Sequence, residues 1–283
     1  MSTTRDTTAQ MPLEQLTPPG RPLPTGSPEK VGQPVGGPHT SQPLLLPTDR
    51  AGGPIAYYGP DRLKTELTKL ANDSIADIAQ GWCDVPVEIP ITPLHVTLLA
   101  KGASGQATAT FAGSKMSAAT VVANANQERM PEVIKHEMTH IVLHARCGLN
   151  LPRWFDEGCA SLSEGEETLN KFRRDLVQNY LVNNRGISFQ ALFMRSDPPT
   201  GDQVWPFYAE ATTLIKFLRD RAPGETVREK QHYLVRFICD VIRDGASMEA
   251  YQLHVRSYFG FPRVSALQQA WLESIVAEEA VHP

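Results

Sequence analysis

The chain of 283 residues lacks any long apolar run. No stretch approaches the roughly 18 consecutive apolar residues that mark a membrane-spanning helix. Residues 1–6 lead into polar sequence without the apolar core of a signal peptide. These absences predict a soluble, cytoplasmic protein without a membrane span. An export route or a different true start stays open.

An excess of positive charge is also absent. The chain has 27 Lys and Arg residues against 31 Asp and Glu residues, which gives a formal net charge of −4. No cluster of Lys and Arg stands out, whereas nucleic-acid binding depends on such clusters to neutralise phosphates. We therefore expect no nucleic-acid partner.

Cysteine is scarce. Cys83, Cys147, Cys159 and Cys239 are too few and too widely spaced for a disulfide framework. We expect four free, buried thiols.

What the sequence does contain is a zinc-hydrolase motif, His-Glu-Met-Thr-His, at residues 136–140. Such a short pattern arises by chance in on the order of one per cent of chains of this length, so its context matters. Pro131 suits a helix start and Gly148 a helix end, which predicts a helix over residues 131–147. On that helix His136 and His140 share one face. Glu137 would lie beside them, where its carboxylate can reach a metal-bound water as a general base.

The third ligand is less clear from spacing. The metzincin pattern HExxHxxGxxH is absent, since Leu143 stands where its glycine belongs. His144 lies one further turn along the same helix, roughly 6 Å away, too far to share a tetrahedral ion. We expect His144 to be hydrogen-bonded or solvent-facing. The nearest carboxylates beyond the helix are Asp156 and Glu157.

Between residues 132 and 161 the chain resembles the gluzincin metallopeptidases, in particular the peptidase MA-like domains. These carry HExxH and then Leu-Pro-x-Trp-Phe-x-Glu-Gly, which this chain has at residues 151–158. The resemblance implies a zinc ion held by His136, His140 and Glu157, in place of Asp156. It also implies that the two aromatic residues of the second motif pack at the start of a second helix.

The resemblance continues more weakly through residues 205–218. It implies that Tyr208 donates a hydrogen bond to the oxyanion of the tetrahedral intermediate. An ordinary amphipathic tyrosine, with its ring packed and its hydroxyl wet, is the alternative. One departure concerns the acidic residue that many gluzincins place four positions after the third ligand, because this chain has Ser161 there. A serine can still accept a hydrogen bond from an imidazole, but it tunes the ligand less than a carboxylate does.

Residues 1–54, rich in proline and glycine, predict a disordered arm, with a propeptide or a partner-binding tail as functional alternatives. Residues 55–283 predict one α+β, zincin-like domain. A lobe at 55–160 would hold a small mixed sheet and the active-site helix, and 161–283 would form a helical lobe, with the cleft between them. We expect residues 119–123 to form the sheet edge that pairs with an extended substrate. The predicted helices span 61–80, 131–147, 169–183, 208–221, 226–244, 248–258 and 264–277, and the predicted strands span 95–99, 107–111 and 120–122.

Together these residues predict a zinc-dependent metallopeptidase that acts on peptides or proteins, with Glu137 as general base and Tyr208 as a possible oxyanion donor. Two other classes stay open: a catalytically inactive binding module of the same fold, and a non-peptide hydrolase. A structural zinc site of Cys147 and Cys159 with the two histidines is a further alternative, although it leaves Glu137 without a role. Neither substrate specificity nor oligomeric state follows from the sequence.

Overall fold

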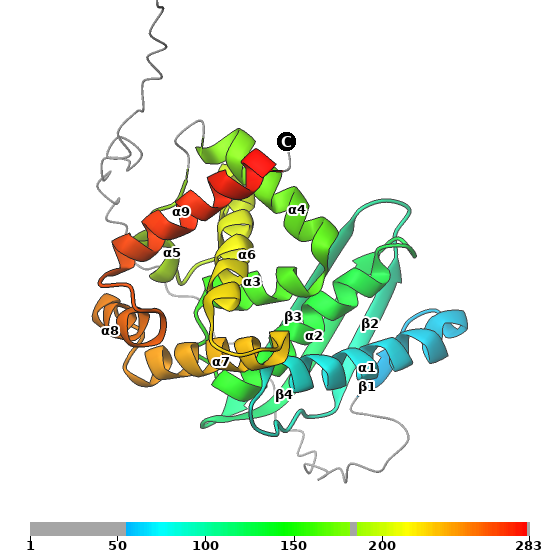
Figure 1. The fold of residues 1–283 in the computed structure, drawn as a ribbon. Coiled ribbons are helices and arrows are strands. Elements are labelled where there is room, and N and C mark those ends of the chain that lie inside the picture. Colours follow the sequence, from blue (N-terminus) through cyan, green and yellow to red (C-terminus); the bar gives the residue numbers. More distant parts are fainter. Residues whose placement is uncertain (1–54, 182–185, 282–283) are drawn as a thin grey trace, which may run out of the picture.

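The computed structural model describes residues 55–181 and 186–281, which form a mixed α+β fold (Figure 1). The expected arm at residues 1–54 lies outside the described residues. Among the described helices, none combines the length and the apolar character needed to cross a bilayer.

Four strands form a single mixed sheet in the order β1-β2-β4-β3. β1 runs parallel to β2 and β2 parallel to β4, whereas β3 is antiparallel to β4. Val121 of β4 lies between Leu94 of β2 and Ala107 of β3. The strands are β1 (Ile55–Tyr58), β2 (Thr92–Leu98), β3 (Ala103–Ala112) and β4 (Lys115–Ala125).

One face of the sheet is buried by two helices, α1 (Lys64–Trp82) and α2 (Met130–Cys147), which lie on the same side of it (Figure 1). Side chains on β4 alternate between buried and more exposed positions, as expected for a strand with one covered face. Val121, Ala123 and Ala125 are fully buried toward these helices.

The structure corrects the expected edge of the sheet. Residues 119–123 belong to β4, which is paired on both sides, so they cannot form an edge. The edge strand that contacts α2 is β3, whose residues are exposed or only partly buried. The apolar residues in this segment reflect the central place of β4 in the sheet. β1 was not predicted.

The helical part of the chain follows α2. The predicted helices at 208–221, 226–244, 248–258 and 264–277 are confirmed within a few residues, and α5 was not predicted. The predicted helix at 169–183 is split between α4 and a π-helical segment, and its last two residues lie outside the described part. The elements are α3 (Arg153–Ser163), α4 (Glu166–Asp175), the π-helical η3 (Leu176–Leu181), α5 (Phe189–Phe193), α6 (Val204–Arg221), α7 (Val227–Arg243), α8 (Met248–Phe259) and α9 (Val264–Val281).

Helix α3 ties this helical part to the sheet-bearing part. α3 packs against both α2 and α6, and it runs across the expected boundary between residues 160 and 161. Trp154 and Phe155 are fully buried at its start, which confirms their predicted packing role. The indole nitrogen of Trp154 donates to the hydroxyl of Tyr251 on α8 at 3.0 Å. α6 runs through the middle of the helical part, with α3, α4, α7 and α9 around it (Figure 1).

Candidate metal centre

Helix α2 begins and ends as its sequence predicts. Pro131 stands in its first turn, and Gly148 ends it with a φ of 86°, a conformation that favours glycine. Ile134, Met138 and Ile141 are buried and fix one side of the helix in the core. The other side carries the two histidine rings, whose centroids are 5.0 Å apart.

The structure brings His136, His140 and Glu157 together. The Oε2 atom of Glu157 lies 3.6 Å from the Nε2 atom of each histidine. Tetrahedral zinc with bonds of about 2.0–2.1 Å separates its ligand atoms by roughly 3.4 Å. The observed spacing is therefore close to what one tetrahedral ion requires. All three candidate ligand atoms lie within 4.8 Å of one another.

Glu157 reaches this place because α3 packs very closely on α6. A β-carbon on Gly158 would lie 2.7 Å from the carbonyl oxygen of Ala211 on α6, so only glycine permits this approach. The chain reverses between α2 and α3 through Pro152, whose extended backbone precedes the first turn of α3. The glycine after Glu157 thus sets the depth of the helix that carries the candidate ligand.

Each histidine is also held on its outer nitrogen. The Nδ1 atom of His136 lies 2.6 Å from Oε1 of Glu164, and that of His140 lies 2.7 Å from Oδ1 of Asp156. A carboxylate on Nδ1 fixes the ring so that Nε2 faces the shared point, which is typical of zinc-binding histidines. Asp156 therefore lies behind the ligands and Glu157 among them.

The sequence did not lead us to Glu164, because the residue expected to partner a candidate ligand histidine was Ser161. A signal was available, since Glu164 follows Glu157 by seven residues, or two turns of helix on the same face. The partners of the two outer nitrogens are Asp156 and Glu164, and Ser161 is buried nearby in α3. The departure at Ser161 is thus offset by carboxylates at two other positions.

His144 was expected to be hydrogen-bonded or solvent-facing, and the structure shows that it is hydrogen-bonded. Its Nδ1 lies 3.1 Å from the carbonyl oxygen of Gly148, and its Nε2 lies 3.3 Å from Oδ2 of Asp156. It is absent from the group with metal-binding geometry. Asp156 accordingly connects His140 and His144 through its two oxygens.

The electrostatics of the group favour a positive charge at its centre. Burial alone would lower the pKa of His136, but the nearby carboxylate of Glu157 and the hydrogen-bonded carboxylate of Glu164 raise it to about 10. Burial raises the pKa of Glu157, and the two histidines more than reverse this and leave it below its usual value. Two imidazoles among carboxylates, both mostly shielded from solvent, therefore form a donor set that fits a divalent cation, with nitrogen and oxygen donors of the kind zinc takes.

Glu137 lies at an open cleft of about 290 Å³ between α2 and β3. Burial raises the pKa of its carboxyl group, against the opposing effect of the histidines. β3 comes so close that a β-carbon at Gly105 would collide with the Glu137 carboxylate. The cleft is lined by Ala103, Ser104, Gly105, Arg129, Glu132, Val133, His136, Glu137, Glu164 and Tyr208.

Tyr208 reaches this cleft from α6. Burial and then the nearby Glu157 carboxylate raise the pKa of its hydroxyl, so it stays protonated and able to donate. Arg153, which sequence reasoning did not single out, places Nη2 3.2 Å from Oε1 of Glu157. It stands four residues before Glu157 on α3, a spacing that brings side chains together on a helix.

The cysteines do not join the group. Among the described residues, the group with metal-binding geometry consists of His136, His140 and Glu157. Cys159 is fully buried in α3, and the sulfur of Cys147 faces that of Cys239. This geometry argues against the structural site of two cysteines and two histidines. In comparisons with protein-family models, curated proteins and solved structures, nothing matches this chain.

Proposed function

We propose that the protein is a zinc-dependent peptidase with a zincin-like fold of gluzincin type. One observation carries this proposal: two imidazoles and a carboxylate meet at one-ion spacing, with Glu137 beside them in an open cleft. The resemblance of residues 132–161 to peptidase MA-like domains adds to it. A purely structural site would not need the open cleft or the adjacent glutamate.

In this proposal His136, His140 and Glu157 hold the zinc ion. When bound there, the ion would supply Lewis acidity, which activates water for attack and polarises a carbonyl group. Glu137 takes a proton from the attacking water and delivers it to the leaving amine. Its raised pKa, due to burial, brings it nearer to neutrality, where such transfer is most effective.

The surrounding residues position this machinery. Asp156 and Glu164 orient the two imidazoles, and Arg153 holds the outer oxygen of Glu157. Tyr208 donates a hydrogen bond to the developing oxyanion, a contribution worth about 3 kcal/mol where one such donor has been removed in other enzymes.

An extended peptide would bind along β3. This edge strand borders the cleft at residues 103–105 and is paired on one side only, with β4. Its free edge can therefore hydrogen-bond a substrate backbone next to Glu137. This places the substrate on β3, in contrast to the segment 119–123 favoured by the sequence.

Glu137→Gln is the direct test. The amide is the same size and keeps the three proposed ligands, but it cannot accept the proton. We expect zinc content to stay unchanged and cleavage of an unbiased peptide mixture, followed by mass spectrometry, to fall at least about 100-fold.

Glu128→Gln is the matched control, because Glu128 is exposed just before α2. It should cleave like the wild type. Cleavage retained in Glu137→Gln would contradict the general-base role. A zinc-loaded wild type that cleaves no peptide would contradict the peptidase proposal and favour a binding module.

A further inference from the structure

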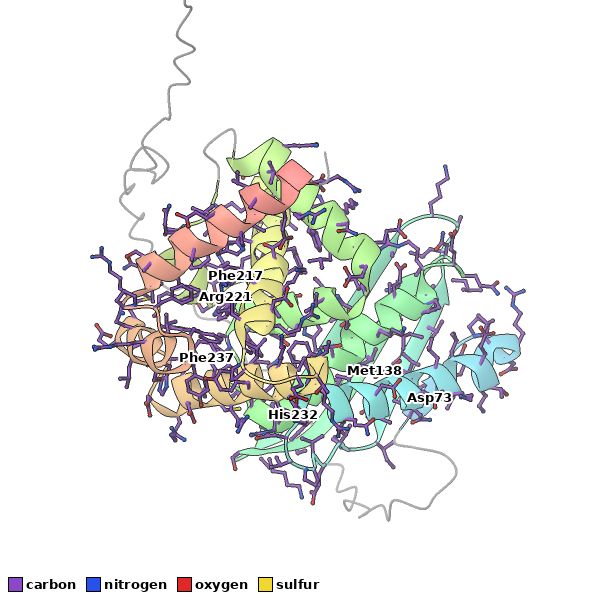
Figure 2. All side chains as sticks on the ribbon, in the orientation of Figure 1. Asp73, Met138, Phe217, Arg221, His232 and Phe237 are labelled. Atoms are coloured by element: carbon purple, nitrogen blue, oxygen red, sulfur yellow. The ribbon has the colours of Figure 1, made fainter. Side chains whose placement is uncertain are left out.

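The C-terminal ends of α1 and α2 lie against α7. Cys147 is the last residue of α2, and its sulfur lies 2.9 Å from that of Cys239 on α7. His232, earlier on α7, lies beside the end of α1, with Nε2 3.1 Å from the carbonyl oxygen of Gln80 (Figure 2). The two thiols therefore sit where α1, α2 and α7 are packed together.

The approach of the two sulfurs is close enough for a bond. A disulfide has an S–S length of about 2.05 Å, so the sulfurs need to move together by under about 1 Å. Both cysteines are free and only partly buried. A small oxidant can thus reach them, and closure requires little movement of either helix.

A fixed arginine stands beside this pair. Nη1 of Arg146 lies 3.5 Å from the sulfur of Cys239. The Nε and Nη2 atoms of the same guanidinium donate to Oδ1 of Asp84, at 3.0 and 2.8 Å. Asp84 therefore holds the positive charge of Arg146 next to Cys239.

The two thiols differ in acidity. The Cys147 thiol donates to Cys239 and, with Arg146, lowers the pKa of Cys239 against burial and the carboxylates of Asp84 and Asp240. The pKa of Cys147 is raised well above its usual value, because its proton is held by Cys239 and its sulfur is desolvated. Cys239 is therefore the sulfur that carries negative charge first, which is the form that reacts with oxidants.

We propose that Cys147 and Cys239 are a reversible oxidation site, at which a hydroperoxide closes a disulfide that fastens the metal-bearing helix α2 to α7. The Cys239 thiolate attacks the terminal oxygen of the hydroperoxide, the O–O bond breaks, and Cys239 becomes a sulfenic acid. The other oxygen leaves as hydroxide or alkoxide and takes a proton from solvent to give water or an alcohol. The Cys147 sulfur then attacks the Cys239 sulfur. The S–O bond breaks, the S–S bond forms, and the proton of Cys147 leaves with the hydroxyl as water. Two thiols are oxidised and one peroxide is reduced.

The other two cysteines are less suited to this reaction. Burial raises the pKa of Cys83 to about 12. Cys159 is fully buried, and its pKa is also raised well above the usual value by burial. Reaction at the pair Cys147 and Cys239 should therefore be selective.

The disulfide would close a chain segment that carries part of the candidate site. The two cysteines are 92 residues apart in sequence, and the closed loop would contain both Glu157 and Tyr208. A loop of this length restricts the unfolded chain strongly, so closure should raise the melting temperature by on the order of 10 °C.

The test uses the full chain treated with a slight excess of hydrogen peroxide, blocked with an alkylating reagent and mapped by mass spectrometry. We expect a linked peptide pair containing Cys147 and Cys239, its loss on treatment with dithiothreitol, and the rise in melting temperature. Cys159→Ala is the control and should form the same link. Cys147→Ser and Cys239→Ser should each lose both the link and the temperature shift.

Three results would overturn the proposal: sulfinic acid at Cys239 without a link, a link to Cys83, or a link between chains. If one serine variant fails to fold, the other variant and the wild-type peptide map still decide. None of these readouts depends on peptide cleavage, so the proposal stands or falls separately from the proposed function.

Discussion

At the residue scale, Glu210 is a buried carboxyl group that the proposed mechanism does not use. It lies on α6 two positions after Tyr208 and is fully buried. Its Oε1 accepts a hydrogen bond from the backbone N–H of Ile187 at 2.6 Å, while Oε2 has no partner among the described residues. Burial raises the pKa of Glu210 to about 8.

This pKa makes stability depend on pH. The folded state binds the proton of Glu210 more tightly than the unfolded chain does. Protonation of Glu210 therefore contributes fully to the free energy of unfolding below about pH 4.5, and this contribution is lost as the pH rises to about 8. Glu210→Gln keeps the acceptor for Ile187 and removes the ionisation. We expect this variant to be more stable than the wild type at pH 8.5 by on the order of 2–3 kcal/mol.

Urea unfolding at pH 5 and pH 8.5 measures this difference. The exposed residue Glu66 supplies the control, and Glu66→Gln should show the same pH dependence as the wild type. A Glu210→Gln variant whose stability changes with pH as much as that of the wild type would show that Glu210 ionises freely in the folded state.

Residues of the candidate site could be predicted from the sequence where they lie close together along one helix. His136, Glu137 and His140 are fixed relative to one another by the period of one helix, so their mutual placement follows from spacing. Arg153 meets Glu157 at the i,i+4 spacing of α3, which the sequence shows, whereas Glu164 meets His136 because α3 lies against α2. Glu157 was preferred to Asp156 as the third ligand from the resemblance alone. In the structure Glu157 lies in the candidate ligand group, and Asp156 contacts Nδ1 of His140.

At the element scale, α2 and α3 act as a matched pair. α2 supplies both imidazoles, and α3 supplies the facing carboxylate of Glu157 together with Asp156 behind His140. Glu164 directly follows α3 and holds His136 from behind. The geometry of the group therefore depends on how these two helices pack, in addition to the residues themselves.

Removal of Glu164 tests this pairing. Glu164→Ala leaves the three proposed ligands intact but frees the ring of His136 and removes its charge partner. We expect the affinity for zinc to fall about 10–100-fold, because outer partners of ligating histidines typically have effects of that size. Competition with a chromophoric chelator measures the affinity without reference to catalysis.

Glu167→Ala is the control for this test, since Glu167 is exposed in the first turn of α4. It should bind zinc like the wild type. Equal zinc affinity in Glu164→Ala and the wild type would show that His136 does not need its outer partner.

The elements were predicted better than their pairing. Helices α6 to α9 could be predicted from the sequence because the spacing of apolar residues along a helix is local. The order of the strands could not be predicted, because neighbours in a sheet can be distant in sequence. β4 and β3 show this: the apolar strand lies inside, and the Ser, Gly, Gln and Thr residues of β3 mark the edge.

At the scale of the whole molecule, the candidate centre depends on both parts of the fold. The sheet-bearing part supplies α2 and the edge strand β3, and the helical part supplies Tyr208 from α6. α3 joins the two, because it packs on α2 and α6 at once. Zinc bound at His136, His140 and Glu157 would therefore also link the sheet-bearing part to the helices beyond α2.

The central claim is that one zinc ion is held by two histidines and one glutamate, with a further position open for water. X-ray absorption at the zinc edge of the purified, zinc-loaded protein tests it most directly, because it reports the type of ligand atom and its distance. We predict a single zinc with only nitrogen and oxygen neighbours at about 2.0–2.1 Å. Sulfur neighbours at about 2.3 Å, or failure to retain zinc, would contradict the claim.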